Sequence, residues 1–220
     1  MSQTAPHSHI HGGNVANQHT HSRPAPGGFK EANRQWFDAK AHSHEGGYEA
    51  EPAAVDMAKK ASATYLEAFP FDKSQTVVLD FASGTDFGVD ISSKSVEFYN
   101  KRFATQGVSP EEVKSICFDI IERSKVEKDP FNGIEFDVIV CSGAYHHLDD
   151  INETTKALAS LLSHHEHVVV NASGFTEESI RSAFVDAGGL QEFSFKPAFQ
   201  LSWNEKAADL FVAKAVRPTL

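Results

Sequence analysis

Two marks of a nucleotide-binding β-α-β unit lie unusually close together in this chain. Residues 77–90 read VVLDFASGTDFGVD: an apolar run ending in an acid, a turn of small residues, and a second apolar run ending in Asp90. In such a unit the acid that binds ribose hydroxyls follows the glycine turn by roughly 20 residues, with a helix between them. Here only residues 85–89 separate Gly84 from Asp90, whereas a parallel crossover needs about a dozen residues or more. The pattern predicts an α/β sheet whose first crossover helix is missing.

Composition and charge exclude several classes of function. The chain has 220 residues, with 20 Lys and Arg against 30 Asp and Glu, a formal charge of −10. Sequence-independent nucleic-acid binding needs a basic surface, and an acidic chain is repelled by anionic membranes. No run approaches the roughly 18 apolar residues of a spanning helix, and the N-terminus lacks a signal-peptide core. We expect a cytoplasmic protein that binds neither nucleic acid nor membranes.

The cysteines and histidines predict no special site. Cys117 and Cys141 lie in apolar runs, ICFDI and VIVCS, so both are expected to be small buried hydrophobes without a disulfide. Most of the 12 histidines fall in residues 1–44. Their spacing is loose and no cysteine or carboxylate cluster completes a ligand set, so no metal site is expected.

Composition divides the chain into three segments. Residues 1–28 are polar, rich in His, Gly and Pro, and predicted to be a disordered tail. Residues 29–74 carry two apolar helical patterns separated by Gly46-Gly47, and are expected to form a helical lid or substrate segment. Residues 75–220 alternate strand and helix signals, which predicts an α/β domain with a largely parallel, Rossmann-like sheet.

The expected elements of this domain follow in order along the chain. The predicted strands are residues 76–81, 87–91, 115–120, 136–142 and 167–171, and then an antiparallel pair, 192–201 and 209–216. The predicted helices are residues 93–106, capped by Ser92, a helix opening at Ser109-Pro110, residues 150–162, and residues 176–188, capped by Thr176.

Acidic or polar residues close four successive strands, where ligands bind in open α/β sheets. They are Asp80, Asp90, Asp119 and Ser142. A tight turn of Ala82, Ser83 and Gly84 follows the first, so that the backbone can approach a ligand. A lone Asp after a strand is more often a turn former or helix cap, and a His-His pair is more often a packing element. Four in series are much harder to explain in that way.

These segments resemble the consecutive motifs of class I S-adenosylmethionine-dependent methyltransferases of the small-molecule type. The matching segments are VVLDFASGT, GVDIS, CFDI and FDVIVCSGAYHHLDDI, and in the tail GFTEESIRSAFVDAGG followed by two strands ending in LFVAK. The resemblance covers about residues 30–218. It implies a mostly parallel sheet with an antiparallel C-terminal strand pair. It also implies transfer of a methyl group from S-adenosylmethionine to a small-molecule acceptor.

The resemblance also implies a role for each site residue. Asp80 would lie near the methionine amino group, and Ala82, Ser83 and Gly84 would border the methionine moiety. The ribose would be held by Asp90. The remaining positions surround the adenine and the acceptor: Ile91 on the adenine ring, Asp119 and Ile120 at its amine edge, Ser142 beside the methyl group, and His146 and His147 on the substrate side, where either could act as a general base.

Two departures from the family pattern leave alternatives open. Asp86 replaces the last glycine of the turn, and Leu162 runs into SHHEHVVVNASGF without the Pro-Gly-Gly turn that precedes the family's fifth strand. Either HVVVN is a substitute strand or it lies beyond a lost segment, as in a deleted form of a longer protein. One alternative is a methyltransferase-like binding or regulatory protein without activity. A Rossmann dehydrogenase fits less well, since no Tyr-x-x-x-Lys pair is visible.

Overall fold

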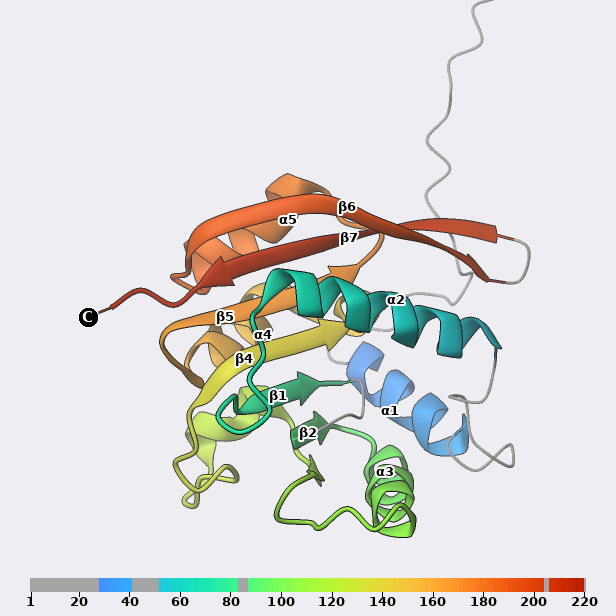
Figure 1. Ribbon diagram of the computed structural model, residues 1–220. Coiled ribbons are helices and arrows are strands. Elements are labelled where there is room, and N and C mark those ends of the chain that lie inside the picture. The colour runs from blue at the N-terminus through green and yellow to red at the C-terminus, as the bar shows by residue number, and fades with distance from the viewer. Residues whose placement is uncertain (1–27, 41–51, 83–86, 204–205, 220) are drawn as a thin grey trace, which may run out of the picture.

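A single seven-stranded sheet organises the protein. The computed structural model describes residues 28–40, 52–82, 87–203 and 206–219. The strands are β1 (Val78–Phe81), β2 (Phe87–Asp90), β3 (Lys114–Cys117), β4 (Phe136–Ser142), β5 (Leu162–Ala172), β6 (Gln191–Trp203) and β7 (Lys206–Val216). Their spatial order is β3-β2-β1-β4-β5-β7-β6, parallel from β3 to β5 and antiparallel at β7 and β6 (Figure 1). The predicted α/β fold with an antiparallel C-terminal pair is confirmed.

Capping side chains mark the N-termini of α3, α4 and α5. They are α1 (Gly28–Lys40), α2 (Pro52–Ala68), α3 (Ser93–Thr105), α4 (Ile151–Ala159), α5 (Glu177–Arg181), which continues as the π-helix η4 (Ser182–Ala187), and the 3-10 helices η2 (Ile120–Lys125) and η3 (Tyr145–His147). Ser92, Asp150 and Thr176 each accept backbone N–H groups of the first turn of α3, α4 and α5, which satisfies donors that have no partner within the helix.

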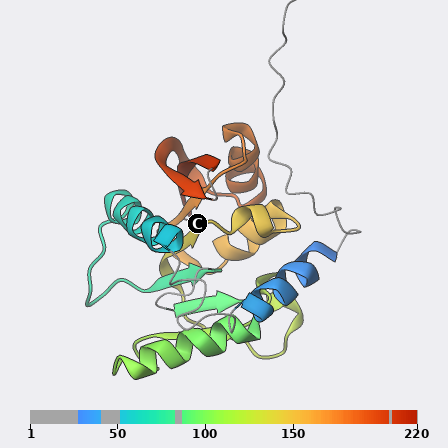
Figure 2. The same cartoon turned by 90° about the vertical axis from the view of Figure 1, so that its right-hand side faces the viewer.

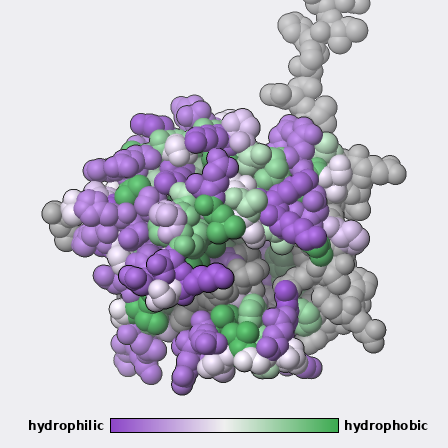
Figure 3. Space-filling view, viewed as in Figure 1, coloured by the Kyte–Doolittle hydropathy of each residue, from purple (hydrophilic) through white to green (hydrophobic). Residues whose placement is uncertain are grey.

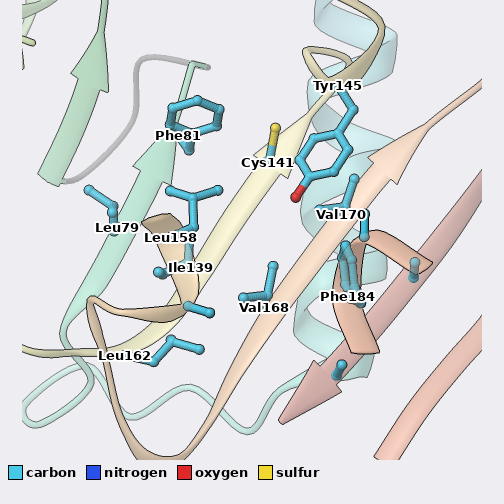
Figure 4. Close-up of a cluster of buried hydrophobic side chains, with 14 of the residues drawn as sticks. Leu79, Phe81, Ile139, Cys141, Tyr145, Leu158, Leu162, Val168, Val170 and Phe184 are labelled. Carbon is cyan, nitrogen blue, oxygen red and sulfur yellow. The ribbon is translucent and has the colours of Figure 1, made fainter. Parts of the chain in front are cut away.

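Helices cover both faces of the sheet, and alternation along the strands assigns the side chains to them. Figure 2 shows α2 on one side of the strands and α4 with α5 on the other. The face under α4 and α5 carries the larger core, in which buried residues from the central strands meet helix residues (Figure 4). These are Leu79, Phe81, Ile139, Cys141, Val168 and Val170 from strands, and Leu158, Ile180 and Phe184 from helices. Burial of each such aliphatic side chain contributes roughly 1.5–3 kcal/mol.

The face under α2 carries a smaller apolar cluster. Phe69, just beyond the end of α2, packs with Val138 and Val140 of β4 and Val169 of β5. Because the apolar row on β4 lies under one end of α2 and runs towards the carboxyl end of the strand, the same face continues to Ser142.

The strands β1 and β2 pair in parallel although only residues 82–86 separate them. Leu79 lies opposite Phe87, and Phe81 lies opposite Val89. The Ala82 N–H donates to the Val89 carbonyl at 3.0 Å, with Ala82 at a φ of 59°. A connection far shorter than the dozen residues of an ordinary crossover thus joins neighbouring parallel strands, and it leaves no room for the family's first helix.

The segment HVVVN serves as the fifth strand. It lies in β5, where Val140 is paired with Val169 and Ser142 with Asn171 in parallel register. The strand begins earlier than predicted, at Leu162, because α4 ends at Ala159 and the chain turns back at once.

Two expectations from the sequence are wrong. Ser109-Pro110 opens only a single turn, in which the Val113 N–H donates to the Ser109 carbonyl, because β3 begins at Lys114. Cys117 is exposed rather than buried, because it ends β3, which is an edge strand of the sheet. Cys141, on a central strand, is buried as predicted. The predicted histidine-rich tail lies, apart from Gly28, outside the described residues.

Candidate functional site

The carboxyl ends of the parallel strands meet at one edge of the sheet. The register aligns Asp80 with Gly88 and Val140, aligns Asp90 with Cys117, and aligns Ser142 with Asn171. Figure 2 looks onto this edge and shows α1 in front of the strand ends. The polar residues that the sequence places at these strand ends are therefore brought to one edge, as ligand binding in an open α/β sheet requires.

Asp80 is a buried carboxylate in the central strand β1, with 2% of its surface exposed. Its charge reaches two neighbours. Burial is the main cause that raises the pKa of the Cys141 thiol and of the Tyr65 hydroxyl, and the negative charge of Asp80 adds to it in both cases. A negative charge inside the sheet edge therefore favours a cationic or hydrogen-donating ligand group.

Asp90 ends β2 and accepts a hydrogen bond from the Ser92 N–H at 2.7 Å. The pKa of Asp90 is raised from its ordinary 3.8 to about 6, mainly by burial and to a smaller extent by the neighbouring carboxylate of Asp38. The backbone N–H groups of Ser92 and Ile91 act in the opposite direction. The charged form of this carboxylate is therefore costly, and donors that bind to it would stabilise that form.

Asp38 reaches the same place from α1. Its carboxylate accepts from the Ser92 hydroxyl at 2.7 Å and from the Lys94 N–H at 3.2 Å. Burial raises the pKa of Asp38, but these two bonds and the charge of Arg34 outweigh it and hold that pKa below its ordinary value. Two carboxylates thus flank the first turn of α3, where the helix dipole favours negative charge.

The turn after β1 is described only in part. Ala82 adopts a left-handed backbone conformation, with its N–H on the Val89 carbonyl. Ser83, Gly84 and Asp86 lie outside the described residues. The turn begins with a conformation that glycine adopts without strain and alanine adopts at a cost.

Asp119 begins η2 rather than ending β3. It accepts from the Ile121 N–H, and its other oxygen forms an ion pair with Lys30 of α1 at 2.6 Å. This hydrogen bond is the main reason that the pKa of Lys30 is raised. Ile120 is 3% exposed and packs into the hydrophobic core, whereas Ile91 lies half-buried just beyond β2, with its carbonyl 3.6 Å from the Cys117 sulfur.

The histidine pair lies in η3, directly after β4. His146 is exposed and His147 is half-buried, with ring centroids 4.0 Å apart. α1 fixes His147, since Asn33 Nδ2 donates to its carbonyl at 2.8 Å and the Phe37 ring packs edge-on against its imidazole. The pair is therefore placed at the carboxyl edge, beside the end of β4.

Three further polar groups lie under α2 at this edge. They are the Tyr65 hydroxyl, the Ser142 hydroxyl and the side-chain amide of Asn171, all of them shielded from solvent. Burial is the main cause that raises the pKa of Tyr65 well above its ordinary value, while Ser142 and Asn171 lie near enough to lower it.

The sequence predictions missed the residues that the helices bring to the edge. Lys30, Asn33, Asp38 and Tyr65 stand in segments predicted only as packing or lid helices, and no local signal ties them to strand ends. Asn171 had a signal that could have found it, because it closes the buried run HVVV in the same way that Ser142 closes β4.

Two classes of site find no support in the part of the chain that the structure describes. No group of three or more His, Cys, Asp or Glu residues there is arranged to hold a metal ion. No helix among the described ranges is long and apolar enough to cross a membrane.

Comparison with known proteins shows the fold and gives a family match over part of the chain. The sequence profile of a family described as "Methyltransferase domain" matches residues 72–165, the stretch that contains Asp80, Asp90 and Ser142. Residues 72–165 are thus similar to this domain family. The fold is the Rossmann-like fold of the class I S-adenosylmethionine-dependent methyltransferases.

A curated relative matches part of the chain. An uncharacterised methyltransferase of Schizosaccharomyces pombe is 33% identical over 103 residues, which cover 41% of this chain and 36% of the relative. The chain thus matches about a third of the length of this relative.

Solved structures show the same fold at low identity. Magnesium protoporphyrin IX methyltransferase from Synechocystis superposes with a TM-score of 0.59 and 16% identity, covering 90% of this chain and all of that one. The N-methyltransferase NodS from Bradyrhizobium japonicum gives a TM-score of 0.58 and 15% identity, covering 84% of this chain and 98% of that one. This chain therefore keeps the overall sheet of these structures despite its short connection between β1 and β2.

Proposed function

We propose that this protein binds S-adenosylmethionine at the carboxyl edge of the sheet and transfers its methyl group to a small-molecule acceptor. The observation that carries the proposal is the convergence of Asp80, Asp90 and Ser142 at one edge of a methyltransferase domain. Two of the similar solved structures contain S-adenosylmethionine and S-adenosylhomocysteine, respectively.

The residues at this edge fit the cofactor chemically. The ribose presents two hydroxyl donors, and Asp90 is a carboxylate whose charged form lacks sufficient stabilisation in the protein alone, as its raised pKa shows. The cofactor's amino group is a cation, and Asp80 is a buried carboxylate at the neighbouring strand end. Both pairings place donors on acceptors that are shielded from water.

The chain's own residues have positioning roles in this reaction. When bound, S-adenosylmethionine supplies a methyl group already activated on a sulfonium sulfur. Asp90 would accept hydrogen bonds from the ribose hydroxyls, and Asp80 would bind the amino group of the cofactor. Ser142 would line the site beside the acceptor. His146 or His147 would accept the proton of a weakly acidic nucleophile, since both lie beside the end of β4. Alignment of nucleophile and methyl in a dry site supplies most of the acceleration.

Charge and cysteine chemistry support the partners and location that we propose. The net charge of −10 disfavours nucleic acid and membrane surfaces as partners, and the resemblance of the motifs to small-molecule methyltransferases favours a small-molecule acceptor. Both cysteines are free, and Cys117 is exposed, which suits the reducing cytoplasm.

Calorimetric titration of the protein with S-adenosylmethionine tests this proposal. We expect saturable binding that is weakened by Asp90→Asn. It should be unaffected by the matched Asp186→Asn, whose side chain is exposed in η4 away from the strand ends. Absence of binding at millimolar ligand would refute the proposal.

A second function is favoured by one observation. The connection of residues 82–86 has no room for the crossover helix, so the methionine end of the site lacks a helix N-terminus. This favours a methyltransferase-like binding or regulatory protein without activity. A folded protein that does not bind cofactor in the same titration would support this second function over the first.

A further inference from the structure

The sheet face under α2 ends in a polar row. Along β4 this face carries Val138, Val140 and then Ser142. The paired positions on β5 are Val169 and Asn171, opposite Val140 and Ser142. The change from apolar to polar therefore occurs on both strands at the same level, at the carboxyl edge.

The side chains of this polar row are shielded from solvent and form no hydrogen bond of ordinary geometry within the described part of the chain. Asn171 is fully buried, and neither its side-chain oxygen nor its nitrogen has a hydrogen-bond partner among the described residues. The same holds, within the described part of the chain, for the hydroxyls of Ser142 and Tyr65. Ser142 and Asn171 lower the pKa of Tyr65 as hydrogen-bonding neighbours of its hydroxyl. No hydrogen bond of ordinary geometry joins these groups within the described residues. More than about 90% of buried polar groups have a partner, so this cluster is an exception that calls for a ligand.

The helix above the cluster contacts the sheet along its length, since Ala61 is 2% exposed and Lys60 Nζ donates to the Gln200 carbonyl at 3.0 Å. Phe69 is buried against the sheet, and Lys214 Nζ donates to the Ala68 carbonyl at 2.9 Å. Towards the N-terminus of α2, the Met57 side chain lies over Gly143 at the carboxyl edge of the sheet. A Cβ added to Gly143 would lie 3.4 Å from the Met57 sulfur. Movement of the Met57 side chain would open the cluster beside Gly143 to a small molecule, while Phe69 stays packed against the sheet.

We propose that Tyr65, Ser142 and Asn171 form the acceptor subsite and bind an uncharged group that both donates and accepts hydrogen bonds, such as an amide or a hydroxyl. This rests on the proposed function, which places the reacting methyl group at the same edge.

The chemistry of the cluster selects this class of ligand. The amide of Asn171 offers two donors and an acceptor, and each hydroxyl offers one donor and acceptor sites. All three groups are neutral. The buried charge of Asp80 acts on Tyr65, so a carboxylate or phosphate placed here would be repelled. The subsite therefore accepts a neutral polar group and rejects an anion of the same shape.

A matched pair of probes tests the subsite without cofactor. Benzamide and benzoate have nearly the same shape, but only benzamide is neutral and donates. We expect millimolar benzamide to shift the Asn171 side-chain amide resonances of the full-length ¹⁵N-labelled protein in a saturable way, and benzoate to bind at least tenfold more weakly. No saturable shift with benzamide, or equal binding of both probes, overturns the proposal.

Two tyrosine variants separate binding from folding. Tyr65→Phe should weaken benzamide binding about three- to tenfold, the effect of one lost hydrogen bond. Tyr145→Phe is the control, because the Tyr145 hydroxyl bonds Thr155 at 2.9 Å in the core on the opposite face of the sheet. It should leave benzamide binding unchanged. Unchanged binding in Tyr65→Phe would mean that the cluster holds only water and would overturn the subsite. Cofactor titration is a separate measurement, so failure of the proposed function remains distinguishable.

Discussion

Replacement of Asp90 by Asn should stabilise the protein at alkaline pH. In the folded state the pKa of Asp90 is raised from 3.8 to about 6, chiefly by burial. A raised carboxyl pKa means that the folded protein holds its proton more tightly, so this group's contribution is favourable at low pH and is lost as pH rises through about 6. At pH 8 the buried charge costs roughly 3 kcal/mol, at about 1.36 kcal/mol for each tenfold change in proton affinity.

Asn is the matched substitution because it keeps shape and removes charge. Its amide oxygen can still accept from the Ser92 N–H, which lies 2.7 Å from the carboxylate. We expect Asp90→Asn to raise the free energy of unfolding by about 3 kcal/mol at pH 8, and by only about 1 kcal/mol at pH 4.5. For a protein of this size, the change at pH 8 corresponds to roughly 6–12 °C in Tm.

Thermal and urea unfolding at the two pH values measure this difference. Asp186→Asn serves as the control, because it makes the same change at an exposed side chain. If Asp90→Asn destabilised the protein at pH 8, or by the same amount at pH 8 and pH 4.5, the inference of a costly buried charge would be wrong.

Three further substitutions test other parts of the structure. Lys30→Met removes the ion pair that covers Asp119, and should tighten S-adenosylmethionine binding two- to fivefold by calorimetry, since an exposed pair is worth about 1 kcal/mol or less; weaker binding would show that Lys30 assists the ligand. Ala82→Gly should stabilise the fold by roughly 0.5–1 kcal/mol in urea unfolding, because glycine adopts the observed φ of 59° without strain; a loss of stability would contradict the left-handed turn. Phe184→Ala should cost about 3–5 kcal/mol, since its side chain is fully buried between helix and sheet; a cost below about 1 kcal/mol would place it outside the core.

The strand ends were predictable because the signal is local. An apolar run that ends in a polar residue marks both a buried strand and its carboxyl end, which is why β4 begins and ends where predicted, at Phe136 and Ser142. The C-terminal antiparallel pair was equally clear from its two apolar runs. The missing helix before Asp90 was also visible, since the number of intervening residues is fixed by the sequence.

Contacts between distant segments could not be predicted in this way. Lys30 forms its ion pair with Asp119, which lies 89 residues later in the sequence. The position of α2 brings Tyr65 next to Asn171. Exposure of Cys117 follows from strand order, because β3 lies at an edge. Each depends on which elements become neighbours, and a single sequence does not contain that information.

Groups that lower the folding stability of this protein lie together at the carboxyl edge of the sheet. Asp90 is a carboxylate held where charge is disfavoured, and Tyr65 and Asn171 bury polar atoms without partners among the described residues. Neither feature improves folding, and an apolar or neutral replacement would relieve each. A sheet edge that keeps such groups together is best explained by ligands that supply the missing donors and acceptors. Asp90→Asn and Tyr65→Phe should therefore share one signature, a more stable protein that binds more weakly, whereas a structural role would lower stability and binding together.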